Sequence, residues 1–262
     1  MGVLNVTPDS FFDGGHYFKP EQAIDRGIRL EDEGADILDI GGESTRPPHV
    51  VELPFEEETR RILPVIEGLR KRLRIPISVD TYKAAVARRA IAAGAEMVND
   101  VGGLRFDGNL ASVVAETKAA VVIVHSRGSP TTMHGLPPSS GIVRLVVSGL
   151  RARIRKARKA GIPLSRIVID PGIGFGKQPH ESLKLLHNLN SLRQLKLPIL
   201  VGVSRKSFLG QILRQPVESR LIGSLAAASV AVVEGAHILR VHDVKETVQV
   251  LKICDAILRG NV

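Results

Sequence analysis

Eight short runs of apolar and β-branched residues recur along the chain, separated by stretches with the hydrophobic period of a helix. The runs are VLNV (3–6), ILDIGG (37–42), ISVD (77–80), MVNDV (97–101), AVVIVHS (120–126), IVIDPGI (167–173), ILVGVS (199–204) and HILRVHD (237–243). Their apolar residues are continuous rather than alternating, which is typical of parallel strands buried on both faces. Helices are predicted at 20–35, 82–95 and 217–236, ending at Gly34, Gly94 and Gly235.

This alternation predicts an α/β fold, a (β/α)8 barrel formed by the whole chain, residues 1–262, as a single domain. An open doubly wound sheet is the alternative, but no G-x-G-x-x-G follows the first strand. No apolar run approaches the roughly 20 residues that span a bilayer, so no membrane segment is predicted.

Composition narrows the range of partners. The formal net charge of +9 would suit a nucleic-acid binder, but aromatic residues make up only 3% of the chain and the basic residues are spread along helices. Stacking platforms for bases are therefore scarce, and a small anionic substrate is favoured over nucleic acid. The single cysteine, Cys254, cannot form an internal disulfide, which suggests a cytoplasmic protein.

Polar side chains stand at or just past the C-terminal end of every predicted strand. They are Asn5, Asp39, Asp80, Asn99, His125, Asp170, Arg205, Lys206, Arg240 and His242. In a barrel these ends converge on one mouth, where this fold places its chemistry. Any one of them could cap a helix or a turn, but the whole set would be costly to bury unless it faced a ligand.

Two groups within this set suggest two kinds of recognition. Strand-end carboxylates and amides such as Asp80, Asn99 and Asp170 could bind the N–H groups of an amino-pyrimidine ring. The cations that follow strands seven and eight suggest a phosphate or diphosphate site, with an ion pair between Arg240 and Asp243 or a loop acid as the alternative. P-loop, H-E-x-x-H, C-x-x-C and G-x-S-x-G motifs are absent.

The motifs taken together resemble the dihydropteroate synthase family of pterin-binding barrels, from Met1 to about residue 250. They are GVLNVTPDSFFDGG, DIGGESTRP, EEETRRILPVI, ISVDTYKAAVARRAIAAGAEMVNDVGGL, VHSRGSP, IDPGIGFGK, GVSRKSFLG and RVHDV, in that order. The resemblance implies a transferase of folate biosynthesis that joins 7,8-dihydropterin-6-ylmethyl diphosphate to 4-aminobenzoate. Diphosphate would leave before the amine attacks, with no covalent enzyme intermediate.

The resemblance also implies roles for individual residues. The pterin pocket would comprise Asp80, Asn99, Asp170 and Lys206, with Phe175 in its wall. Asn5, Arg240 and His242 would hold the diphosphate, and Asn5 would also bind Mg2+. Loops carrying Asp9, Ser10 and Phe11, and Thr45, Arg46 and Pro47, would close over the site, with Ser207 near the carboxylate of aminobenzoate. Asp80, Asp170, Lys206, Arg240 and His242 would form the catalytic set.

The chain departs from the family pattern in three places. Pro48 replaces the usual Gly, which should stiffen its loop, and Val124 replaces the usual Met before His125. Members usually carry residues ahead of the first strand, so a cover at the barrel bottom is expected to be missing from this numbering. A homodimer formed through helices late in the chain is also expected, and the apolar segment 221–233 is compatible with it but could equally cover the barrel.

Two other functions stay open. A corrinoid-dependent methyltransferase on a related barrel would not need the cationic cluster of Arg205, Lys206, Arg240 and His242. A non-catalytic pterin-binding paralogue would be expected to lack Asn5, Asp9 or Arg46, all of which are present.

Overall fold

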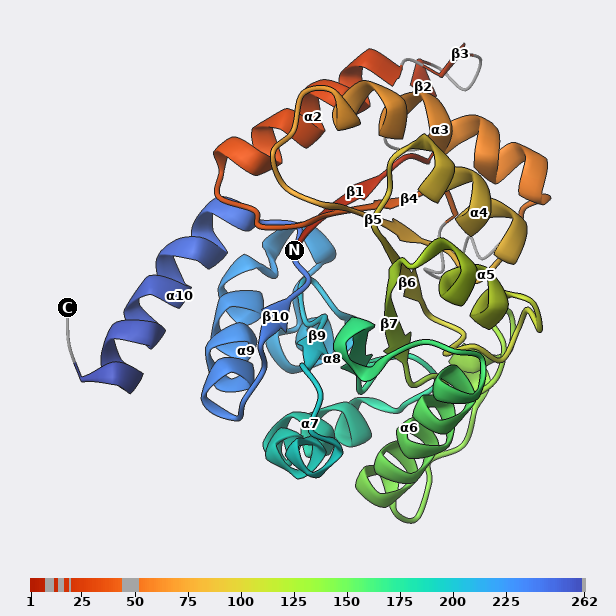
Figure 1. The fold of residues 1–262 in the computed structure, drawn as a ribbon. Helices are drawn as coiled ribbons and strands as arrows, with labels where there is room; N and C mark the ends of the chain where they lie inside the picture. The colour runs from red at the N-terminus through yellow and green to blue at the C-terminus, as the bar shows by residue number, and fades with distance from the viewer. Residues whose placement is uncertain (8–11, 14–16, 19, 44–51, 261–262) are drawn as a thin grey trace.

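The computed structural model describes residues 1–7, 12–13, 17–18, 20–43 and 52–260. Along them, parallel strands alternate with helices (Figure 1). The barrel strands are β1 (Gly2–Asn5), β4 (Leu38–Gly41), β5 (Ile77–Asp80), β6 (Met97–Asp100), β7 (Ala120–Val124), β8 (Ile167–Asp170), β9 (Leu200–Val201) and β10 (Ile238–Leu239). Every predicted run overlaps one of them. Most end earlier than predicted, because the polar residues that follow leave the ladder to form the mouth.

The strands close into a barrel. Six form one sheet in the order β1-β4-β5-β6-β7-β8, and β9 pairs with β10. Single parallel bridges, Gly2 with Val241 and Ile169 with Ile199, join these two sheets on both sides. The strand order therefore follows the chain and returns to its start, which confirms the (β/α)8 barrel and excludes the open sheet. A short antiparallel pair, β2 (Phe12–Asp13) with β3 (Tyr17–Phe18), follows β1.

Helices surround the strands as an outer layer (Figure 1). They are α2 (Pro20–Asp32), α3 (Phe55–Arg70), α4 (Ala84–Ala93), α5 (Leu110–Thr117), α6 (Ile142–Lys159), α7 (Pro179–His187), α8 (Ser207–Leu213), α9 (Leu221–Val233) and α10 (Val244–Arg259). The predicted helices at 20–35 and 82–95 are confirmed as α2 and α4. The glycine that follows α4, Gly94, has φ +120°, a conformation that other residues rarely adopt.

The predicted helix at 217–236 is wrong over its first turn. Val217–Ser219 form a separate 3-10 turn, and α9 begins only after Arg220. The Arg220 guanidinium donates to the carbonyl oxygens of Gln215 (3.1 Å) and Arg205 (3.2 Å). Arg220 therefore stabilises the loop that precedes α9. Its bond to Arg205 joins distant segments, which a hydrophobic period cannot reveal.

Two apolar layers hold the barrel. One lies between strands and helices and includes Leu4, Ile40 and Val98; the other fills the interior and includes Val122 and Val168. The alternation of strand side chains separates the two. Parallel register puts Asp39 level with Ser78, and Asp80 level with Asn99, Val122 and Val168. These polar side chains therefore share the interior face, with Asp39 deeper in the barrel.

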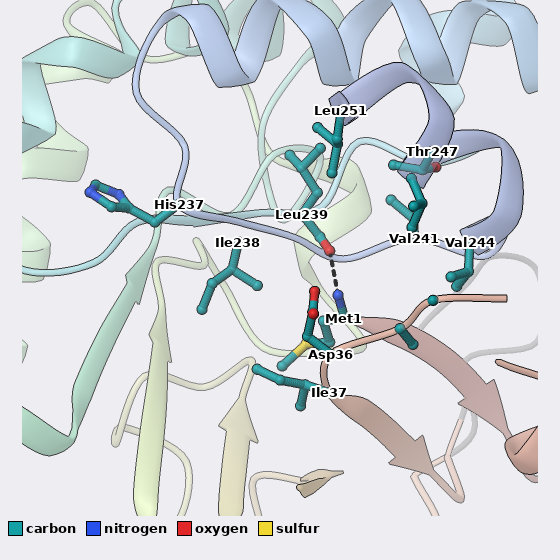
Figure 2. A pocket seen from close by; sticks show the side chains of 13 residues that line it. Met1, Asp36, Ile37, His237, Ile238, Leu239, Val241, Val244, Thr247 and Leu251 are labelled. Carbon is teal, nitrogen blue, oxygen red and sulfur yellow. Dashed lines mark hydrogen bonds between the residues drawn. The ribbon is translucent and has the colours of Figure 1, made fainter. Parts of the chain in front are cut away.

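The other end of the barrel is apolar. A cavity of about 240 Å³ lies there, between the starts of β1, β4 and β10 and helix α10 (Figure 2). The amino group of Met1 donates to the Leu239 carbonyl oxygen at 3.0 Å beside it, and burial lowers the pKa of that amine. None of the predicted site residues lines this cavity. In the described part of the chain, no helix is long and apolar enough to cross a bilayer.

Candidate active site

The floor of the mouth is a network of acids around one arginine. The Arg240 guanidinium donates from Nε to Asp39 Oδ2 and from Nη2 to Asp80 Oδ2, both at 2.6 Å. The Asn99 side-chain amide donates to the same Asp39 oxygen at 3.0 Å. These residues come from β4, β5, β6 and the segment after β10, so the barrel brings together side chains from distant parts of the sequence. Asp39, which has no role in the predicted site, is at the centre of the network.

Electrostatics keep the arginine charged and leave the floor acidic. Burial opposes the charge of Arg240, but Asp39 and Asp80 outweigh it and raise its pKa above the ordinary value. Burial raises the pKa of Asp80 to about 7; Arg240 opposes this shift, and the nearby Asp39 adds to it. Two carboxylates thus share one guanidinium, and the network has a surplus of negative charge when both are ionised. It is suited to a ligand that brings N–H donors or positive charge.

Asp170, Phe175 and Lys206 form the neighbouring part of the mouth. The Asp170 carboxylate ends β8 and accepts the Gly172 backbone N–H at 2.6 Å. Burial raises the pKa of Asp170 to about 6, although this hydrogen bond and the charge of Lys206 oppose the shift. The Lys206 ammonium lies 4.1 Å from the centre of the Phe175 ring, a cation–π contact. These contacts bring the predicted pocket residues Asp170 and Lys206 and the predicted wall residue together.

Buried cations build the loops on this side. The Lys177 ammonium donates to the carbonyl oxygens of His125 (2.7 Å), Gly172 (2.8 Å) and Phe175 (3.0 Å). Arg153 donates in the same way to the carbonyl oxygens of Val124 (2.5 Å) and Ser126 (3.0 Å). We call Arg153 and Lys177 the carbonyl-bound cations. They join the loop after β7 to the loop after β8 and to α6.

Gly172 and His125 show how closely these loops pack. Gly172 has φ +67°, and a Cβ atom there would lie 2.0 Å from the His125 carbonyl oxygen, so only glycine fits. The His125 ring is buried, and its Nδ1 has no hydrogen-bond partner among the described residues. Burial, followed by the charges of Lys177 and Arg153, lowers the pKa of His125 to about 2. This strand-end histidine is therefore a neutral structural residue.

The predicted cationic cluster after strands seven and eight divides between several partners. Arg205 forms a two-point ion pair with Asp243, at 2.9 and 2.7 Å. The alternative of an Arg240–Asp243 pair is therefore wrong, and Arg240 is engaged by strand acids rather than by a loop acid. The His242 ring nitrogen Nδ1 lies 2.9 Å from the Ser204 hydroxyl. Arg240 and His242 are thus held by different partners at the same mouth.

The structure describes some of the remaining predicted residues and not others. Asn5 ends β1 and is half-buried, and Ser207 begins α8 and is exposed. Val124, the departure from the family pattern, is buried inside the barrel beside Val122 and Val168. Six predicted loop residues lie outside the described residues, as does Pro48: Asp9, Ser10, Phe11, Thr45, Arg46 and Pro47. Within the described ranges, no group of three or more His, Cys, Asp or Glu is arranged to hold a metal ion.

Together, the fold and the site define a (β/α)8 barrel whose single mouth combines buried acids with cations. A family model described as "Pterin binding enzyme" matches residues 1–242. The dihydropteroate synthase of Synechocystis sp. is 43% identical over 260 residues, which are 99% of this chain and 90% of that protein. The chain therefore belongs to the pterin-binding enzyme family, within the dihydropteroate synthases, which confirms the resemblance found in the sequence.

Solved structures agree. The Xanthomonas albilineans dihydropteroate synthase with 4-aminobenzoic acid matches with a TM-score of 0.91 and 45% identity, over 98% of this chain and 92% of that one. The same enzyme in complex with 7,8-dihydropteroate matches with a TM-score of 0.88 and 43% identity, with the same coverage.

Proposed function

We propose that the chain transfers the 7,8-dihydropterin-6-ylmethyl group from its diphosphate to the amine of 4-aminobenzoate, giving 7,8-dihydropteroate and diphosphate in folate biosynthesis. The C–O bond to diphosphate breaks, the C–N bond forms, and the amine loses a proton. The observation that carries the proposal is the gathering of Asp80, Asn99, Asp170 and Lys206 at one mouth in a chain of this family. The dihydropteroate-bound relative supports the product assignment.

The acidic floor supports recognition of the pterin ring. A carboxylate accepts two parallel N–H bonds from an amino-pyrimidine edge, and Asp80 or Asp170 has that chemistry. The oxygen Asn99 Oδ1 is buried and has no partner among the described residues, so it can accept a further N–H. Lys206 supplies donors on the side of Asp170, where its contact with Phe175 holds it beside the pocket wall.

The same charges support the chemical step. When diphosphate leaves first, positive charge spreads into the pterin ring, and the ionised carboxylates of Asp80 and Asp170 stabilise it electrostatically. The amine nitrogen of 4-aminobenzoate then attacks the methylene carbon. We propose that the loops carrying Asp9, Ser10 and Phe11, and Thr45, Arg46 and Pro47, shield that carbon from water. Ser207, exposed at the start of α8, would meet the carboxylate of the second substrate.

The diphosphate would lie on the side of Asn5 and His242. Arg240 has one nitrogen, Nη1, that bonds to none of the described residues, which leaves it a donor for a phosphate oxygen while Nε and Nη2 hold the acids. Mg2+ typically binds through one or two protein oxygens together with substrate phosphates. A single amide oxygen from Asn5, with no described group of three or more His, Cys, Asp or Glu arranged to hold a metal ion, fits a magnesium ion that the diphosphate carries. When bound, this ion would neutralise charge on the leaving group.

A homodimer is proposed from the exposed apolar side chains of α9 and α10. Ile222 is 80% exposed and Ile257 73% exposed, and the two helices pack against each other. Large apolar side chains on adjacent helices favour burial against a second copy. Sedimentation velocity of the wild type and of an Ile222→Glu, Ile257→Glu variant tests this.

The single cysteine supports placement in the reducing cytoplasm.

Diphosphate release, measured with and without 4-aminobenzoate, tests the proposed reaction. We expect release from the pterin substrate that depends on 4-aminobenzoate, in step with formation of dihydropteroate. Binding of both substrates without turnover would instead support a non-catalytic pterin-binding protein. Methyl transfer from methyl-tetrahydrofolate to a corrinoid, with no diphosphate chemistry, would support the methyltransferase.

A further inference from the structure

Asp39 is a buried carboxylate directly beneath residues that the proposed mechanism uses. It lies on β4, its side chain is 0% exposed, and it accepts from both Arg240 and Asn99 through a single oxygen, Oδ2. The other oxygen, Oδ1, has no hydrogen-bond partner among the described residues. A charge buried at this depth is costly, and an apolar side chain would be cheaper for the fold. The packing of the barrel therefore does not account for this residue.

Asp39 settles the orientation of the Asn99 amide. An asparagine amide can present either its oxygen or its NH2 group in a given direction, and its partners decide which. The carboxylate of Asp39 can only accept, so it holds the Asn99 Nδ2 group at 3.0 Å and leaves Oδ1 as the acceptor of that side chain. A reversed amide would set two acceptor oxygens against each other.

Asp39 also settles the orientation of Arg240. The guanidinium is held at two points, by Asp39 at Nε and by Asp80 at Nη2. A planar guanidinium held at two points cannot rotate about its own axis, so the direction of Nη1 is set as well. Without Asp39, the guanidinium would be fixed by Asp80 alone.

We infer that Asp39 is a positioning residue for the pterin diphosphate site, acting through Asn99 on the pterin ring and through Arg240 on the diphosphate rather than by contact with substrate. The inference rests on the proposed function, since it assigns Asn99 Oδ1 to an N–H of the pterin ring. Its consequence is selectivity: loss of Asp39 impairs binding of the pterin substrate and leaves binding of 4-aminobenzoate unchanged.

The test compares Asp39→Asn with Ser78→Ala. Asn preserves the volume of Asp and removes the charge. Ser78 is level with Asp39 on the neighbouring strand, is equally buried, and has a hydroxyl without a partner among the described residues. Steady-state kinetics with each substrate varied in turn give the two KM values, and thermal unfolding gives Tm. For Asp39→Asn we expect the pterin KM to rise at least tenfold, the aminobenzoate KM to change less than twofold, and Tm to stay within a few degrees. Ser78→Ala should match the wild type.

A second measurement is independent of turnover. The Asn99 side-chain NH2 signals in a 15N-correlated NMR spectrum are assigned by their loss in Asn99→Ala. Asp39→Asn should shift them in the free protein, and Ser78→Ala should not. Unchanged Asn99 signals in Asp39→Asn overturn the inference even if the wild type proves inactive, whereas an inactive wild type whose signals respond overturns only the proposed function. Equal weakening of both substrates together with a large fall in Tm would reduce Asp39 to a purely structural residue.

Discussion

Charged side chains have opposite uses on the two sides of the mouth. On the side of β4, β5 and β6, Asp39 and Asp80 share one guanidinium, and three buried oxygens, Asp39 Oδ1, Ser78 Oγ and Asn99 Oδ1, have no partner in the described structure. On the side of β7 and β8, the carbonyl-bound cations Arg153 and Lys177 donate to backbone oxygens. An unsatisfied buried acceptor is expensive, and we propose that Asn99 Oδ1 meets a ligand, whereas the carbonyl oxygens bound by Arg153 and Lys177 stabilise the loops. Charged side chains that are buried on both sides of the mouth therefore have different roles.

The largest expected effect is on activity, from substitutions in the proposed pterin pocket. Asp80→Ala and Lys206→Ala should each lower kcat/KM by about 100-fold or more, because each removes a charge that the proposed mechanism places beside the pterin ring. Their circular dichroism spectra and Tm should stay close to those of the wild type. Glu116→Ala, which breaks an exposed ion pair with Arg88, is the matched control and should be fully active. Normal kinetics for Asp80→Ala would remove this carboxylate from the mechanism.

Substitution of Lys177, a carbonyl-bound cation on the side of β7 and β8, should lower stability instead. Lys177→Met leaves three backbone carbonyl oxygens without their donor, so the free energy of unfolding should fall by roughly 3 kcal/mol. Denaturant titration measures this. The loops that Lys177 joins carry Phe175, so unfolding removes the pocket wall. Activity should therefore fall in proportion to the folded fraction. A variant that unfolds normally but has no turnover would place Lys177 in the chemistry.

Two buried groups on the side of β7 and β8, Asp170 and His125, should show pH dependences of opposite sign. The pKa of Asp170 is raised to about 6 in the folded protein, so its contribution to stability is full below about pH 4 and is lost as the pH rises through 6. The pKa of His125 is lowered to about 2, so the unfolded chain takes up a proton below about pH 6.5 and stability falls as the pH falls.

Denaturant titrations between pH 4 and 8 compare the wild type with Asp170→Asn and His125→Gln. Relative to Asp170→Asn, the wild type should lose stability with rising pH. Relative to His125→Gln, it should gain stability over the same range. Parallel curves for all three proteins would contradict these two pKa shifts.

The smallest effect is expected at Arg205. Its backbone is in the left-handed region, with φ +57°, and its side chain pairs with Asp243. Both Arg205→Ala and Arg205→Gly lose the ion pair. Alanine keeps the free-energy cost of a left-handed backbone conformation, whereas glycine removes it. The Gly variant should therefore be more stable than the Ala variant by about 1 kcal/mol, as measured by thermal unfolding. Equal stabilities would show that the loop relaxes out of this conformation.

Much of the site could be anticipated from strand ends. Asp80, Asn99, Asp170 and Lys206 follow apolar runs directly, and parallel strands must bring such positions to one end of a barrel. The partner of each charge could not be anticipated. Arg240 lies three residues from Asp243, yet its partners are Asp39 and Asp80, distant in sequence and adjacent only through barrel closure.

Local pattern determined the strands, two of the three helices predicted by range and the end of the barrel at which polar residues gather, because those features depend on spacing along the chain. The motifs, read as a set, determined the family. Tertiary structure alone decided three contacts. Asp39 accepts from both Arg240 and Asn99, Lys177 donates to backbone carbonyl oxygens, and Arg205 is paired with Asp243. The free energy of a buried charge depends on which groups the fold brings within hydrogen-bond distance, and the order of residues does not specify those groups.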